Sequence, residues 1–117
     1  MAKLSDLILL RNDPAVAEEF LEAATRGEVD AQYGMGLIYA EGRGVPQDEA
    51  RAYFWLTMAM EQGDQDAEVL RHVVAESMTS DQHTEAELLI RDFARLGSSD
   101  RKIWRKRRKN QKPSDIH

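Results

Sequence analysis

The step Gly42-Arg43-Gly44 could do chemistry, because closely spaced glycines can present backbone amides to a phosphate group. A phosphate-binding loop of this kind needs a strand before it and a Lys-Ser or Lys-Thr pair at the next helix. Here helical sequence precedes the step, and Val45-Pro46-Gln47-Asp48 follows it. Pro46 has no amide proton, the Asp48 carboxylate would repel an anion, and the glycine spacing does not fit a dinucleotide-binding turn. We therefore predict a bend between two helices.

Other reactive side chains are scattered. His72 and His83 fall on different predicted helices, and no His-x-x-x-His pairing is present. The carboxylates at Glu18–Glu22 and at Glu85 and Glu87 have helical spacing, which is typical of a solvated helix face. The chain has no cysteine. We expect no catalytic residue, no metal site and no cofactor, and we expect that the chain is not an enzyme.

A basic block near the end of the chain is the candidate binding segment. Its members are Trp104, Arg105, Lys106, Arg107, Arg108 and Lys109. The basic side chains could neutralise nucleic-acid phosphates while the indole stacks on a base, rest on an anionic membrane, or dock on an acidic protein surface, including the body of this chain. Since blocks of like charge resist folding, a flexible, solubilising tail at 98–117 is the alternative.

Composition indicates one small domain with a basic tail. Of the 117 residues, 42% are hydrophobic, which is ordinary for a folded protein. Residues 1–99 carry 8 Lys and Arg against 19 Asp and Glu, whereas residues 100–117 carry 8 against 2. The apolar stretch at the N-terminus is short and lies beside Asp6, which argues against a signal peptide or a membrane span. We expect a cytoplasmic protein with a domain at 1–97.

Helical periodicity with start and stop signals occurs five times, and no stretch alternates convincingly with period two. The predicted helices are 14–26, 30–41, 47–62, 65–78 and 80–96. Their start signals are Asp13-Pro14, Asp64 and a capping box at Thr79–Gln82. Because the loops are short, we expect consecutive helices to pack as antiparallel hairpins. The predicted fold is an all-α stack.

Small and large residues alternate on the two helices that flank the glycine bend. Ala31, Gly36 and Ala40 are small positions on the first helix, while Ala52, Trp55, Leu56 and Ala59 alternate small with large on the second. Small residues let helix backbones approach, and large residues then fill the grooves. We expect Trp55 to be the largest core side chain. Met35, Met58 and Met60 are predicted core fillers, with an adaptable groove as the alternative.

These residues resemble a Sel1-like repeat, an α/α repeat that is related to the tetratricopeptide repeat and common in bacterial proteins. The resemblance covers residues 31–63, with partial units on either side. It departs from the family pattern at Gly34, Glu49, Leu56 and Met60. The signature positions are Ala31, Gly36, Tyr39, Gly42, Gly44, Val45, Asp48, Ala52, Trp55, Ala59 and Gly63.

The resemblance implies a short α/α superhelix that binds another protein without catalysis. We expect an adaptor or scaffold with the basic tail as a secondary contact, and a nucleic-acid- or ribosome-associated protein as the alternative. A short helix at Leu4–Leu10 is expected to close one end of the stack and the fifth helix the other. The competing arrangement is an open end that pairs with a second copy as a homodimer.

Overall fold

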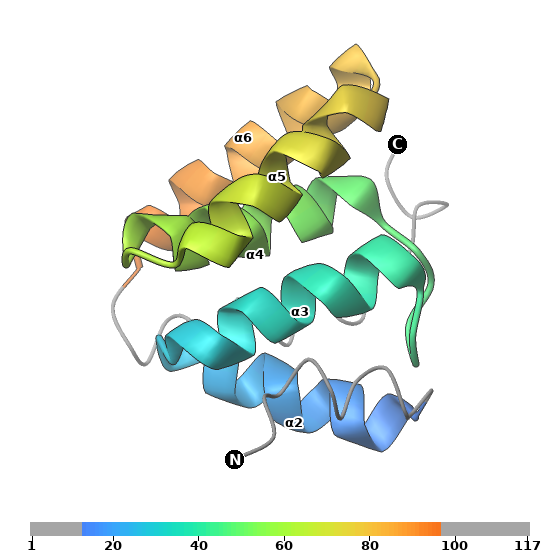
Figure 1. Ribbon diagram of the computed structural model, residues 1–117. Helices are drawn as coiled ribbons and strands as arrows, with labels where there is room; N and C mark the ends of the chain where they lie inside the picture. The colour runs from blue at the N-terminus through green and yellow to red at the C-terminus, as the bar shows by residue number, and fades with distance from the viewer. Residues whose placement is uncertain (1–12, 97–117) are drawn as a thin grey trace.

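The computed structural model describes residues 13–96, and in that range every regular element is a helix (Figure 1). The order is α2 (Pro14–Thr25), α3 (Val29–Glu41), α4 (Glu49–Glu61), α5 (Gln65–Ser77) and α6 (Ser80–Ala94). Helix α3 packs on α2 and α4, and α4 packs in turn on α5 and α6. The expected all-α stack of helical hairpins is confirmed. Residues 4–10, predicted to close one end, lie outside the described residues.

The helix boundaries follow the chemical signals in the sequence. The carboxylates of Asp13, Asp48 and Asp64 accept hydrogen bonds from the first-turn amides of α2, α4 and α5. Thr79 opens α6 through the predicted capping box, in which its side chain and that of Gln82 each accept a backbone N–H bond. Each cap satisfies an amide that the helix itself leaves without a partner.

Two details differ from the sequence prediction. Helix α4 begins at Glu49 rather than Gln47, because residues 47 and 48 are tied back to the end of α3. The Gln47 side-chain amide donates to the Ala40 carbonyl over 2.9 Å, and the Asp48 backbone N–H donates to the Tyr39 carbonyl over 3.0 Å. In addition, α5 and α6 pack mainly on α4 rather than on each other, despite the short connection between them.

Helix α4 lies at the centre and is buried on all sides. Every residue from Ala52 to Ala59 is buried, and Phe54 and Leu56 have no exposed surface. The Trp55 side chain is 1% exposed, and its ring centroid lies 5.6 Å from that of Phe93 on α6. A helix that is apolar all round needs neighbours on every side, which α3, α5 and α6 supply. The uncharged run at 52–60 indicates this central position.

The described part of the chain repeats with a period of 36 residues. Helices α3 and α5 have the same length, and both their starts and their ends are 36 residues apart. Gly27 and Gly63, at the turns before these helices, are also 36 residues apart, and both have a φ of 101°. Residues 65–77 therefore form the first helix of a second unit that follows the one containing α3 and α4.

Gly36 allows α3 to approach α4 closely, which generates the first prediction. A Cβ atom at this position would overlap the fully buried Leu56 side chain. Alanine is the better helix former, but overpacking costs about 1–3 kcal/mol, so Gly36→Ala should lower the free energy of unfolding by about 1–2 kcal/mol. Urea denaturation of the full chain measures this loss.

The control is the same substitution in a Leu56→Ala background, where the overlapping side chain is gone. There, Gly36→Ala should be neutral or stabilising, because only the gain in helix propensity remains. Equal losses in the two backgrounds would show that Leu56 does not explain the glycine.

Candidate partner-binding surface

The glycine corner between α3 and α4 is packed against the start of α2. Gly42 and Gly44 have φ values of 70° and 79°, the left-handed conformation that glycine adopts without steric cost. A Cβ on Gly44 would lie 2.8 Å from the backbone carbonyl carbon of Asp13. Val45 is half-buried and packs on the cluster that contains Trp55. The corner is thus a packed bend, as predicted.

Two glutamines tie neighbouring turns together. The buried Gln32 side chain donates to the Ala24 carbonyl over 3.2 Å. The Gln62 side-chain amide donates to the Gln32 side-chain oxygen over 2.7 Å and to the Gly27 carbonyl over 3.0 Å. The Ala24 carbonyl at the end of α2 and the Gly27 carbonyl in the following turn each accept a side-chain hydrogen bond in this way. The alanine signature positions Ala31, Ala52 and Ala59 are each at most 2% exposed.

The described residues do not gather reactive side chains into a site. Between residues 13 and 96, no group of three His, Asp or Glu side chains could hold a metal ion. His72 is exposed on α5, whereas His83 on α6 is half-buried with its ring edge-on to Tyr53. The same range contains no helix with the length and apolar character needed to span a bilayer. Of the carboxylates predicted to be solvated, Glu19, Glu22, Glu85 and Glu87 are exposed and Glu18 is half-buried.

The most distinctive surface is formed by matching stripes on α3 and α5. Side chains spaced by three and four residues share one side of a helix. The stripe on α3 contains Asp30, Tyr33, Leu37 and Glu41, and the stripe on α5 contains Asp66, Val69, Val73 and Ser77. The two stripes are 36 residues apart, position by position. We call these eight residues the α3–α5 face.

The centre of the α3–α5 face is apolar and open to solvent. Val69 and Val73 are 67% and 55% exposed, and Tyr33 and Leu37 are half-buried. In the part of the chain that the structure describes, the only other large hydrophobic side chain with comparable exposure is Leu88 on α6. Scattered exposed apolar residues need no explanation, but four of them on two adjacent stripes form a candidate contact surface.

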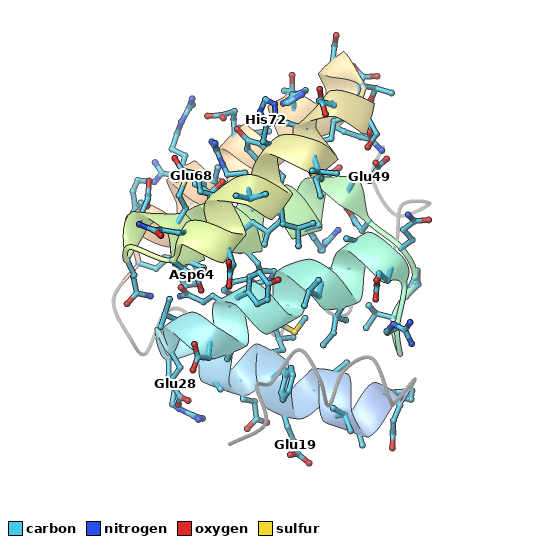
Figure 2. All side chains as sticks on the ribbon, viewed as in Figure 1. Glu19, Glu28, Glu49, Asp64, Glu68 and His72 are labelled. Carbon is cyan, nitrogen blue, oxygen red and sulfur yellow. The ribbon has the colours of Figure 1, made fainter. Side chains whose placement is uncertain are left out.

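The rim of the α3–α5 face is acidic. Burial, followed by the charges of Asp66, Asp64 and Glu41, raises the pKa of Tyr33 above its ordinary value. Glu41 belongs to the end of α3, whereas Asp64 and Asp66 belong to the cap and first turn of α5. Figure 2 shows Asp64 between the start of α5 and α3, with Glu68 and His72 on the other side of α5. Arg43 pairs with Glu41 over 2.7 Å, whereas no member of the face is basic.

On the side of α5 away from Val69 and Val73, Arg71 forms a polar cluster with Thr57 and Tyr53 of α4. This cluster was not predicted from the sequence. Arg71 donates to the Thr57 hydroxyl over 2.7 Å and to the Tyr53 hydroxyl over 2.5 Å, and its guanidinium lies 4.3 Å from the centre of the Tyr53 ring. Thr57 and Tyr53 are both buried on α4. These contacts add to the packing of the buried Ala67 and Val74, which face α4 and leave Val69 and Val73 on the outer side of α5.

The residues predicted to bind partners, Trp104 to Lys109, lie outside the described residues, as does the whole predicted tail at 98–117. Their role stays a prediction. The α3–α5 face, by contrast, was not predicted as a site. The signal for it is the recurrence of Asp30, Tyr33 and Leu37 as Asp66, Val69 and Val73, which appears once the 36-residue period is known.

The corner generates a second prediction. Gly44→Ala should be more destabilising than Gly63→Ala, although both positions have positive φ. A side chain in that conformation costs about 1–2 kcal/mol, but only at Gly44 would it also collide with the start of α2, since nothing lies within 4 Å of a Cβ at Gly63. Urea denaturation should show an additional loss of about 1 kcal/mol or more. Equal losses would mean that the corner does not pack on α2.

Comparison with known proteins agrees with this geometry. Over 73 residues, which are 62% of this chain, the sequence is 30% identical to the alginate biosynthesis protein AlgK from Azotobacter vinelandii. The match spans 16% of the length of that relative. The sequence model of the Sel1 repeat matches residues 29–64, which run from the start of α3 to the turn after α4. Residues 29–64 of this chain are therefore a Sel1 repeat.

Proposed function

We propose that this chain is a non-enzymatic adaptor that binds another protein through the α3–α5 face. Sel1 repeats generally mediate protein–protein interaction. The observation that carries the proposal is the repeated pair of apolar positions on two adjacent helices, of which Val69 and Val73 are exposed and Tyr33 and Leu37 are half-buried. Interfaces gain most of their affinity from a few apolar side chains near the centre of the contact.

The rim favours a partner segment that carries both apolar and basic side chains. Asp30, Asp66 and Glu41 surround the apolar centre and would attract Lys and Arg on an approaching chain. The same charges disfavour acidic partners, which gives selectivity as well as a faster encounter. In this proposal the basic block at residues 105–109 adds a secondary contact, and the cytoplasm stays the expected compartment.

Nucleic-acid binding through the basic block is the second candidate, because Trp104 beside five consecutive basic residues suits stacking combined with phosphate neutralisation. The rest of the chain does not help this function. Residues 13–96 carry 18 Asp and Glu against 6 Lys and Arg, which repels phosphate. Such binding would weaken steeply with salt and would vanish when residues 100–117 are removed.

The third prediction concerns the double variant Val69→Arg/Val73→Arg, made in the full chain and used as bait in quantitative affinity capture. Loss of two central apolar contacts should reduce the retained amount of the specific protein partner by about tenfold or more, because hot-spot side chains are each worth about 2 kcal/mol. Both valines are exposed and arginine is a good helix former, so the fold should persist.

The control is Leu88→Arg, which places an arginine at a 49% exposed apolar residue on α6 and adds one positive charge where the α5 variant adds two. A partner that is retained by the control but lost by the α5 variant supports the proposal. Nuclease treatment and removal of residues 100–117 test the second candidate in the same experiment. If the baits retain identical proteins, or only nucleic acid that depends on residues 100–117, the α3–α5 face is not the binding surface.

A further inference from the structure

Residues 101–109 have a pattern that complements the α3–α5 face. The segment reads Arg-Lys-Ile-Trp-Arg-Lys-Arg-Arg-Lys, in which the apolar pair Ile103-Trp104 has basic residues on both sides. The face has the opposite pattern, since its apolar centre has acidic residues at its edges. Matching arrangements of apolar and charged groups give both affinity and register to a contact.

We propose that residues 101–109 dock on the α3–α5 face of the same molecule. In this arrangement Ile103 and Trp104 cover the exposed valines at 69 and 73, and the flanking basic side chains lie beside Asp30, Asp66 and Glu41. Aromatic and arginine side chains are the groups that most often dominate such contacts.

The charge distribution favours this occupant. Residues 13–96 have a net charge of −12, and the nine-residue segment contains seven Lys and Arg with no acidic residue. The face itself has no basic member, and the basic residue paired at its edge, Arg43, sits beside one of the three acidic positions. Opposite charges on one chain meet at a high local concentration, so even a modest attraction gives substantial occupancy.

The chain between the end of α6 and Trp104 is long compared with α5. Helices α4 and α6 pack together and both run toward the side of the molecule at which α5 begins, with Phe93 near the end of α6 against Trp55 of α4 (Figure 1). Trp104 is the eighth residue after Leu96, and an extended chain of eight residues spans up to roughly 26–29 Å. Helix α5, with 13 residues, is about 20 Å long. The segment from Leu96 to Trp104 is therefore longer, when extended, than the whole of α5.

Docking of this kind would make the chain regulate its own binding surface. The segment would have to leave before a partner could bind, and it would then be released next to that partner as a second contact. This consequence rests on the proposed function, whereas the docking itself does not.

The fourth prediction tests the docking in the full chain. The protein has no cysteine, so Asn110→Cys gives a single position for a nitroxide spin label beside the basic segment. In low salt, the methyl NMR signals of Leu37, Val69 and Val73 should lose most of their intensity relative to the reduced label. The signals of Val16 on α2 and Leu88 on α6 should keep theirs.

Two controls separate docking from proximity and from association between molecules. In about 1 M salt, where charges are screened beyond about 3 Å, the lost intensity should return. The variant Val69→Arg/Val73→Arg should keep the intensity of Leu37 even in low salt. A mixture of isotope-labelled chains without nitroxide and unlabelled chains with nitroxide should show no loss, because the contact lies within one molecule.

Each other outcome overturns the proposal. Intensity that is lost evenly over all helices would mean that the segment has no preferred site, and loss that also appears in the mixed sample would place the contact between two copies. Full methyl signal intensity in every sample would mean that residues 101–109 do not cover the α3–α5 face. The capture experiment is independent: partner binding without loss of signal rejects only the docking, and loss of signal without partner binding rejects only the adaptor function.

Discussion

The fold depends on how closely α3 approaches α4. Gly36 has no side chain where Leu56 lies, and Leu56 is fully buried as a result. This contact fixes one side of α4, and Phe54 and Trp55 then pack against Phe93 of α6. Since protein interiors are packed as densely as organic crystals, the position of one helix restricts those of its neighbours. The α3–α5 face exists because both of its helices rest on the same buried helix.

Local chemical signals predicted most of the fold. Asp13, Asp64 and the capping box at Thr79 start helices where the sequence indicated, because a cap acts on amides only two or three residues away. The predicted start of α4 was two residues too early, because the Gln47 side chain is bonded to the Ala40 carbonyl at the end of α3. The packing of α5 and α6 on α4 rather than on each other depends on contacts that are distant in sequence, and short loops alone do not determine them.

The candidate surface was harder to predict than the helices. Tyr33 and Leu37 look like core residues in the sequence, and the exposure of Val69 and Val73 depends on the rotation of α5. The buried Ala67 and Val74 turn α5 toward α4, and Arg71 adds hydrogen bonds to Thr57 and Tyr53 on α4. A charged side chain that bonds to two buried hydroxyl groups has no signature in a pattern of apolar residues. Patterns in sequence report which residues are apolar, and tertiary contacts decide which of them face water.

The 36-residue repeat separates stability from recognition. The residues that hold α3 and α5 on α4 point inward, whereas Asp30, Asp66, Val69 and Val73 of the stripes are exposed to solvent. Tyr33 and Leu37 on α3 correspond to Val69 and Val73 on α5, and the two helices have the same length. The same backbone can thus carry different surface chemistry at each step. A chain built in this way can acquire new specificity by exchanging a few outward side chains, without rebuilding its interior.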